Sequence, residues 1–118
     1  MDDRRQAPRA GCVLPVRLYP HGEAKVIETL TKDLSVGGLR VLSPIPRPLA
    51  TRFSIEFALG AGEEPLSLAG QLMWFQVLPY SEQYYFGFAF EDVSENTSIR
   101  LSRFIERISS SSIPAKIS

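Results

Sequence analysis

The chain lacks the residues on which most metal centres and many catalytic sites depend. Its 118 residues include one cysteine and one histidine, so no Cys/His cluster is present to hold zinc. His21 lies in a Pro-His-Gly turn, and nothing near it resembles a nucleophile elbow for a Ser-His-Asp triad. A phosphate-binding loop with its lysine is also missing. The sequence therefore predicts that the protein is not an enzyme and has no catalytic residue and no metal site.

Net charge and long hydrophobic runs are absent as well. Thirteen basic and thirteen acidic residues cancel, whereas nucleic-acid-binding domains usually carry a basic excess. No apolar run approaches the length of about 20 residues that a membrane helix needs, and the N-terminus lacks a signal-peptide core. The single Cys12 cannot form an internal disulfide, which is typical of a reducing compartment. We expect a soluble cytoplasmic protein with no membrane span and no nucleic acid polymer as partner.

The hydrophobic pattern indicates short strands. Alternation is clearest over residues 51–59, where Phe53, Ile55 and Phe57 share one face. Turn residues separate this run from similar ones at 13–19, 24–34, 39–42, 66–78 and 84–90. Pro15 marks an edge strand or a strand start, and Gly70 a bulge or a close approach. The pattern predicts a mainly β fold, a small antiparallel β-barrel of about six strands.

The two ends of the chain follow other patterns. Residues 1–11 have no apolar periodicity and are expected to form a flexible arm. Residues 91–108 predict a C-terminal α-helix with Ser94 as its N-cap, because apolar residues recur at helical spacing. That face comprises Leu101, Phe104, Ile105 and Ile108. Residues 109–118 are expected to form a disordered tail, so the predicted barrel and helix together span residues 12–108.

Two short segments carry polar groups suited to binding. The arm holds three arginines, and the stretch KDLSVGGLRV places Asp33 and Ser35 just before two glycines. A guanidinium fork fits phosphate oxygens and the O6/N7 edge of guanine, and a carboxylate accepts from the N1–H and N2–H groups of guanine. The glycines also fit a plain turn, because glycine supplies positive φ and the acceptors bond to nearby backbone. The residues alone leave both interpretations open.

Four motifs taken in order resemble the PilZ domain, a bacterial receptor module for cyclic di-GMP. RQAPR at 5–9 matches Arg-x-x-x-Arg, and DLSVGG at 33–38 matches Asp/Asn-x-Ser-x-x-Gly. GQLMW at 70–74 is similar to the family's Gly-x-Val-x-Trp strand, with Leu72 in place of valine. YFGFAF at 85–90 resembles its last strand. The likeness covers residues 4–108, which is nearly the whole chain.

The resemblance implies a function and the residues that perform it. The protein would be a cyclic di-GMP receptor whose arm closes over the ligand, and a partner protein or a linked effector domain would read the changed surface. Cyclic di-GMP would be a ligand, and no cofactor is implied. The ligand-binding residues implied are Arg4, Arg5, Arg9, Asp33, Ser35, Gly37, Gly38 and Trp74. An arginine just before the first motif, at position 4, implies a stacked pair of cyclic di-GMP molecules.

Other interpretations stay open at this point. The domain could be a protein–protein adaptor that binds no nucleotide. It could also be an oligonucleotide-binding barrel that uses Trp74, Phe75 and Tyr84 as a stacking platform, although neutral charge argues against this. Trp74 fits a half-buried core position equally well. Lys32 and Arg40, which flank the turn, are interpreted as plain surface charge.

Overall fold

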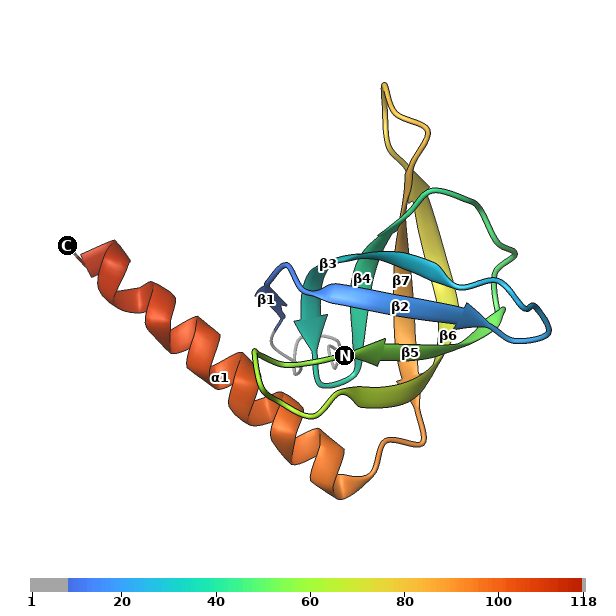
Figure 1. Ribbon diagram of the computed structural model, residues 1–118. Coiled ribbons are helices and arrows are strands. Elements are labelled where there is room, and N and C mark those ends of the chain that lie inside the picture. Colours follow the sequence, from blue (N-terminus) through green and yellow to red (C-terminus); the bar gives the residue numbers. More distant parts are fainter. Residues whose placement is uncertain (1–8, 118) are drawn as a thin grey trace, which may run out of the picture.

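The structure is a computed structural model that describes the backbone of residues 9–117 and the side chains of residues 9–109. The described part consists of seven β-strands followed by one α-helix (Figure 1). These elements are β1 Ala10–Gly11, β2 Pro15–Pro20, β3 Ile27–Ser35, β4 Gly38–Ser43, β5 Arg52–Phe57, β6 Leu66–Val77, β7 Tyr84–Glu91 and α1 Glu95–Ile117. The predicted mainly β fold with a C-terminal helix is confirmed.

Six of the strands form a closed antiparallel barrel. They follow the order β3-β2-β5-β6-β7-β4, and β4 closes the ring by pairing with β3. β2 lies between β3 and β5, so it is not an edge strand. Pro15 occupies its first position, where a missing N–H is tolerated.

The extra strand, β1, belongs to the segment that was expected to be a flexible arm. Ala10 pairs with Leu34, and Gly11 pairs with Asp33, so β1 lies along β3. The expected arm boundary at residue 11 therefore falls beyond the start of regular pairing. Two residues are too few to show periodicity, which is why the pattern of the sequence did not reveal this strand.

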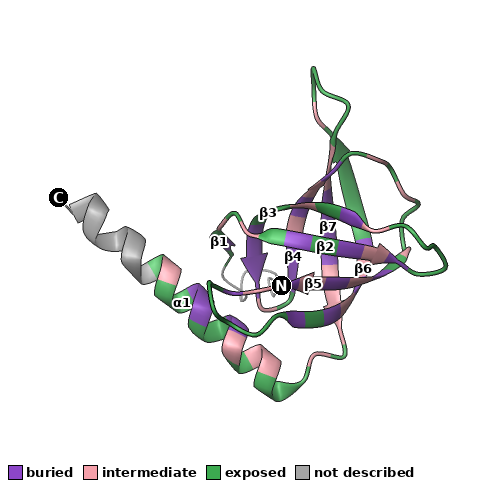
Figure 2. Cartoon of the chain, viewed as in Figure 1, coloured by how far each residue is buried: buried purple, intermediate pink, exposed green. Residues whose placement is uncertain are grey.

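The core fills the inside of the barrel. Phe53, Ile55 and Phe57 are buried as their alternation on β5 predicts, and each is at most 2% exposed. Figure 2 shows buried residues, in purple, along the strands of the barrel. The ring of Phe53 meets Phe86 and Phe88 of β7 edge to face, with centroids 6.4 and 4.9 Å apart. Burial of each such side chain contributes about 1.5–3 kcal/mol, so the shell on which any surface site rests is rigid.

The glycine and the bulge of β6 are separate features. A Cβ on Gly70 would lie 2.6 Å from Ile55 Cδ1, so this glycine serves a close approach inside the barrel. The bulge falls between Leu72 and Trp74 instead. The sequence had left both roles open for Gly70.

α1 packs on the barrel beside β1 and β3. The Ser94 hydroxyl caps it by accepting from the Thr97 N–H at 3.1 Å, and the buried face comprises Leu101, Phe104 and Ile105 as predicted. The helix continues to Ile117, nine residues beyond the end at residue 108 that the apolar spacing indicated. A nucleated helix extends at little cost per residue. Among the described residues, no helix combines the length and hydropathy needed to cross a membrane.

Candidate functional site

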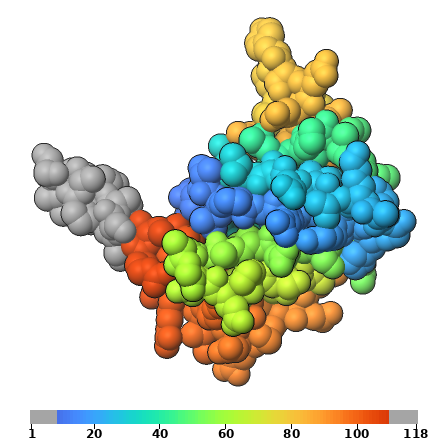
Figure 3. Space-filling view, viewed as in Figure 1, coloured from blue at the N-terminus to red at the C-terminus, as the bar shows by residue number. Residues whose placement is uncertain are grey.

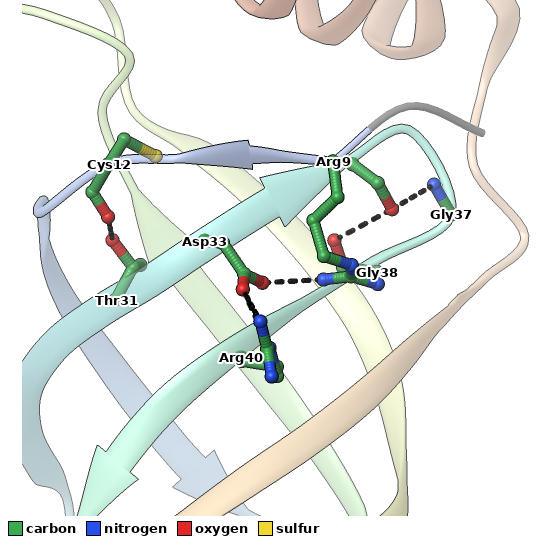
Figure 4. A network of polar contacts seen from close by, with 8 residues as sticks. Arg9, Cys12, Thr31, Asp33, Gly37, Gly38 and Arg40 are labelled. Atoms are coloured by element: carbon green, nitrogen blue, oxygen red, sulfur yellow. Dashed lines mark hydrogen bonds and ion pairs between the residues drawn. The ribbon is translucent and has the colours of Figure 1, made fainter.

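Asp33 lies between two arginines on the outside of the barrel (Figure 4). Arg9 Nη1 donates to Asp33 Oδ1 at 2.6 Å, and Arg40 Nε donates to Oδ2 at 2.6 Å. Arg40 Nη2 also donates to Oδ2. The aspartate is 4% exposed, so the two guanidinium groups cover it and supply the partners that a buried carboxylate requires.

A bulge in β3 turns Asp33 to this side. Thr31 pairs with Val41, which points into the core, whereas Asp33 pairs with Arg40, and the register shifts between Thr31 and Asp33. Side chains alternate along a regular strand, so without a bulge at Lys32 the aspartate would point to the same side as Thr31, into the barrel. The bulge thus places a carboxylate outside the barrel opposite an arginine of β4.

The chain between β1 and β2 is hydrogen-bonded to the same part of β3. Thr31 Oγ1 donates to the Cys12 carbonyl at 2.7 Å and accepts from the Leu14 N–H at 2.8 Å. The Cys12 N–H donates to the Lys32 carbonyl at 3.1 Å. These bonds and the β1–β3 pairing hold the chain so that Arg9 reaches Asp33.

The two arginines keep Asp33 ionised. Burial by itself would raise the pKa of its carboxyl, but the hydrogen bonds and charges of Arg40 and Arg9 outweigh burial, and the pKa lies below its ordinary value. The same contact raises the pKa of Arg40. At neutral pH Asp33 is therefore an acceptor only.

A shallow depression surrounds this cluster and has an excess of positive charge. Its volume is about 440 Å³, and Arg9, Gly11, Lys32, Asp33 and Arg40 line it. Three cations against one carboxylate leave a net charge of +2. Lys32 lies over the ring of Tyr85, with Nζ 4.9 Å from the centroid. The depression suits an anion with two negative charges, and Lys32 and Arg40 are more than the plain surface charges that the sequence indicated.

A larger depression lies elsewhere on the barrel. Its volume is about 780 Å³, and its lining of β2, β3, β5 and the loop after β5 includes none of the residues around Asp33. Its charged side chains pair with one another, since Arg17 lies 3.7 Å from Glu28 and 3.8 Å from Glu56. It therefore offers no unbalanced positive charge to an anion.

The turn after Asp33 is held together by its own groups. The Ser35 hydroxyl accepts from the Gly37 N–H at 3.2 Å and donates to the Gly38 carbonyl at 3.3 Å. A Cβ on Gly38 would lie 2.0 Å from the backbone oxygen of Phe88, so this glycine lets β4 approach β7. Neither glycine adopts positive φ, so the conformational reason expected for them is wrong, and close packing explains Gly38.

Trp74 lies in one cross-strand row with the charged cluster. Trp74 pairs with Gly87, Gly87 with Arg40, and Arg40 with Asp33. A Cβ on Gly87 would lie 2.2 Å from the indole Cε2, so the ring covers this glycine, and Trp74 is 39% exposed. The tryptophan is thus on the outer surface and not in the core. Strand spacing puts it about 14 Å from Asp33.

The three aromatic residues considered as an oligonucleotide platform do not form one surface. Trp74 and Phe75 are consecutive on β6 and therefore face opposite sides of the strand. Phe75 instead meets Tyr84 edge to face, with centroids 6.3 Å apart. A common stacking face for a single strand is absent among these residues.

The predicted site residues divide into three groups. Arg9, Asp33 and Trp74 lie along one surface, while Ser35, Gly37 and Gly38 form the turn beside it. Arg4 and Arg5 lie outside the described residues. Sequence reasoning interpreted Arg40 as plain surface charge and missed Gly87. The only signals for them were a cation two residues after a Gly-Gly pair and a glycine flanked by aromatic residues.

Comparison with known proteins gives a consistent result. The family model described as PilZ domain matches residues 3–107. The structure superposes on the PilZ domain with c-di-GMP of YcgR from Escherichia coli with a TM-score of 0.74 at 19% identity, covering 98% of this chain and 99% of that chain. No curated protein matched.

Two longer chains share the fold. YcgR in complex with c-di-GMP from Escherichia coli gives a TM-score of 0.81 at 20% identity, with 96% of this chain and 49% of that chain covered. The Bacillus subtilis inhibitor of motility MotI/DgrA gives 0.80 at 18% identity, with 93% and 53% covered. The present chain thus spans about half the length of these two proteins.

Proposed function

Because the chain belongs to the PilZ domain family, we propose that it is a receptor for cyclic di-GMP. One observation carries the proposal: an ionised, outward-facing Asp33 lies between Arg9 and Arg40 in a depression of net charge +2. Cyclic di-GMP has two phosphodiester charges and two guanines, so it matches this combination of cations and carboxylate. YcgR, whose PilZ domain shares this fold, is described in complex with c-di-GMP.

Each side chain has a role in the proposed complex. Arg5 and Arg9 contact phosphates and guanine edges, because a guanidinium fork matches both. Asp33 accepts from the N1–H and N2–H groups of one guanine, for which it must be ionised. Arg40 keeps it ionised and in place. Trp74 lies at the other end of the row and offers its exposed ring for stacking.

The turn residues act by shape. Ser35 and the two glycines hold the β3–β4 hairpin so that Asp33 and the backbone present one surface to the ligand. In the proposed complex, Arg4 supports a second cyclic di-GMP stacked on the first.

The proposed output is a conformational switch and involves no catalysis. The Arg9 side chain is 41% exposed, so phosphate oxygens can compete with Asp33 for its guanidinium. When Arg9 exchanges Asp33 for a phosphate, the N-terminal segment moves onto the ligand. This movement changes the surface shown to a partner protein or a linked effector domain. A nucleotide messenger is an intracellular ligand, so the proposal places the receptor in the cytoplasm.

Calorimetric titration with cyclic di-GMP tests the proposal. Arg5→Ala, Arg9→Ala and Asp33→Asn should each weaken binding by about 10- to 100-fold, because a hydrogen bond to a charged group contributes about 1.5–3 kcal/mol. Arg17→Ala is the matched control, since this arginine also pairs with carboxylates but lies in the other depression. It should bind like the wild type.

A second titration uses cyclic di-AMP, which has the same phosphates and no guanine. It should bind far more weakly than cyclic di-GMP. If the wild type releases no heat with cyclic di-GMP, the adaptor interpretation takes the place of the receptor. Binding that is unchanged in all three variants would reject the site.

A further inference from the structure

The β6–β7 hairpin extends beyond the barrel and leaves one edge of β6 uncovered. Its tip stands away from the body of the molecule (Figures 1 and 3). β7 is paired with β4 as far as Tyr84. On the other side, β5 pairs with β6 only as far as Gln71. Leu72 is the last residue of β6 with backbone hydrogen bonds on that side, which it makes to the loop that precedes β5. From Met73 to Val77, β6 is paired with β7 alone among the described residues.

The uncovered edge presents main-chain hydrogen-bonding groups. The Leu78 N–H donates to the Gln83 carbonyl across the hairpin. In an antiparallel pair, residues alternate between pointing these groups at the partner strand and away from it. The N–H and C=O groups of Phe75 and Val77 therefore point away from β7, where another strand could pair with them.

The side chains along this edge are apolar and exposed. The exposed fractions are 53% for Met73, 42% for Phe75 and 61% for Val77, and Tyr80 at the tip is fully exposed. Between residues 70 and 90 the only charged residue is Glu82, although charged residues make up 22% of the chain. Exposed strand edges are normally protected by charges, especially lysine, and this one has none between residues 70 and 81.

We propose that this edge is a dimerisation surface, on which a second copy of the chain pairs antiparallel through its own β6. With Gln76 opposite its own equivalent, Phe75 of each copy faces Val77 of the other. The outward N–H and C=O groups of Phe75 and Val77 in both copies are then all hydrogen-bonded. Phe75 and Val77 of the two copies, four apolar side chains in all, meet on one side of the new sheet. This proposal is independent of the proposed ligand.

The chemistry of the edge favours a second copy over another occupant. A two-fold axis at Gln76 brings the residues beside it close to their own equivalents, so a charged residue there would lie near a like charge. The stretch from Gly70 to Ser81 has none, and no charge on it selects a partner of opposite sign. The pairing brings Phe75 and Val77 of each copy together, and two partly exposed side chains per copy bury less than the about 1,000 Å² of a specific, stable interface. The dimer is therefore weak and concentration-dependent.

Sedimentation velocity from micromolar to millimolar protein tests the proposal. The wild type should shift towards the dimer as its concentration rises. Val77→Lys should weaken association by about tenfold or more, because it places like charges on facing strands. Val13→Lys is the matched control, since Val13 is 70% exposed and lies outside the hairpin, and it should dimerise like the wild type. Far-UV circular dichroism and Tm establish that each variant folds.

A mixture of two variants tests the pairing itself. Val77→Lys and Val77→Glu should each be monomeric alone and should associate when mixed, because the two charges, which are diagonal neighbours across the paired strands, are then opposite. The proposal is overturned if the wild type stays monomeric at millimolar concentration. It is also overturned if Val77→Lys dimerises normally, if Val13→Lys is equally impaired, or if the mixture stays monomeric.

Discussion

Replacement of Arg40 by methionine tests whether this arginine holds Asp33 in place. Methionine retains most of the apolar stem and removes the guanidinium. Arg40 gives Asp33 two hydrogen bonds, and the Asp33 side chain is 5% exposed. The change therefore leaves a buried carboxylate with Arg9 as its remaining charged partner.

The expected loss follows from this geometry. Removing one partner of a fully buried ion pair costs about 3–5 kcal/mol. The cost is smaller here, because the Arg40 side chain is 32% exposed and Arg9 still neutralises the carboxylate. We expect the free energy of unfolding to fall by about 2 kcal/mol, the range of a hydrogen bond to a charged group. For a chain of this size that lowers Tm by about 8 °C.

Urea unfolding with linear extrapolation measures the change, and the m-value should stay constant. Arg17→Met is the control, since that arginine is exposed and lies 3.7 and 3.8 Å from its carboxylate partners. It should leave the free energy of unfolding unchanged. In a double-mutant cycle, Arg40→Met and Asp33→Asn should be non-additive. Additive losses, or an Arg40→Met loss no larger than that of the control, would refute the reasoning.

Two further predictions concern pH and packing. The pKa of Asp33 in the folded protein lies below its unfolded value of about 3.9. The ionised carboxylate therefore contributes fully to the free energy of unfolding above about pH 3.9, and this contribution is lost as the pH falls through the folded pKa. The stability difference between wild type and Asp33→Asn should therefore shrink in urea titrations below about pH 4, and a constant difference would contradict this. Gly38→Ala should lower the free energy of unfolding by about 2–3 kcal/mol, because its Cβ would lie 2.0 Å from a backbone oxygen. Gly37→Ala, with nothing within 4 Å, should change it by less than about 0.5 kcal/mol, and equal losses would contradict the packing argument.

Local periodicity was sufficient to predict the fold. The alternation of Phe53, Ile55 and Phe57 and the helical spacing of Leu101 and Phe104 reflect burial, and both patterns are confirmed. β1 and the length of α1 were not predicted. A two-residue strand has no period, and serines after residue 108 suggested an end that the helix passes.

The geometry around Asp33 depends on strand register, which the sequence does not reveal. Arg40 faces Asp33 only because a bulge shifts β3 by one residue, and that shift also decides which side of the barrel receives the carboxylate. Gly87 lies under Trp74 for the same reason, since β6 and β7 pair across a second bulge. Motifs can name Arg9 and Asp33, whereas their neighbours on other strands follow from pairing.

The position of Trp74 makes the protein its own optical probe. It is the chain's single tryptophan, and its indole lies against Gly87 in the row that contains Arg40 and Asp33. Fluorescence excited selectively in the indole band therefore comes from one known place beside the charged depression. Emission wavelength and quenching can follow events at that surface in unlabelled protein, without a dye that would disturb it.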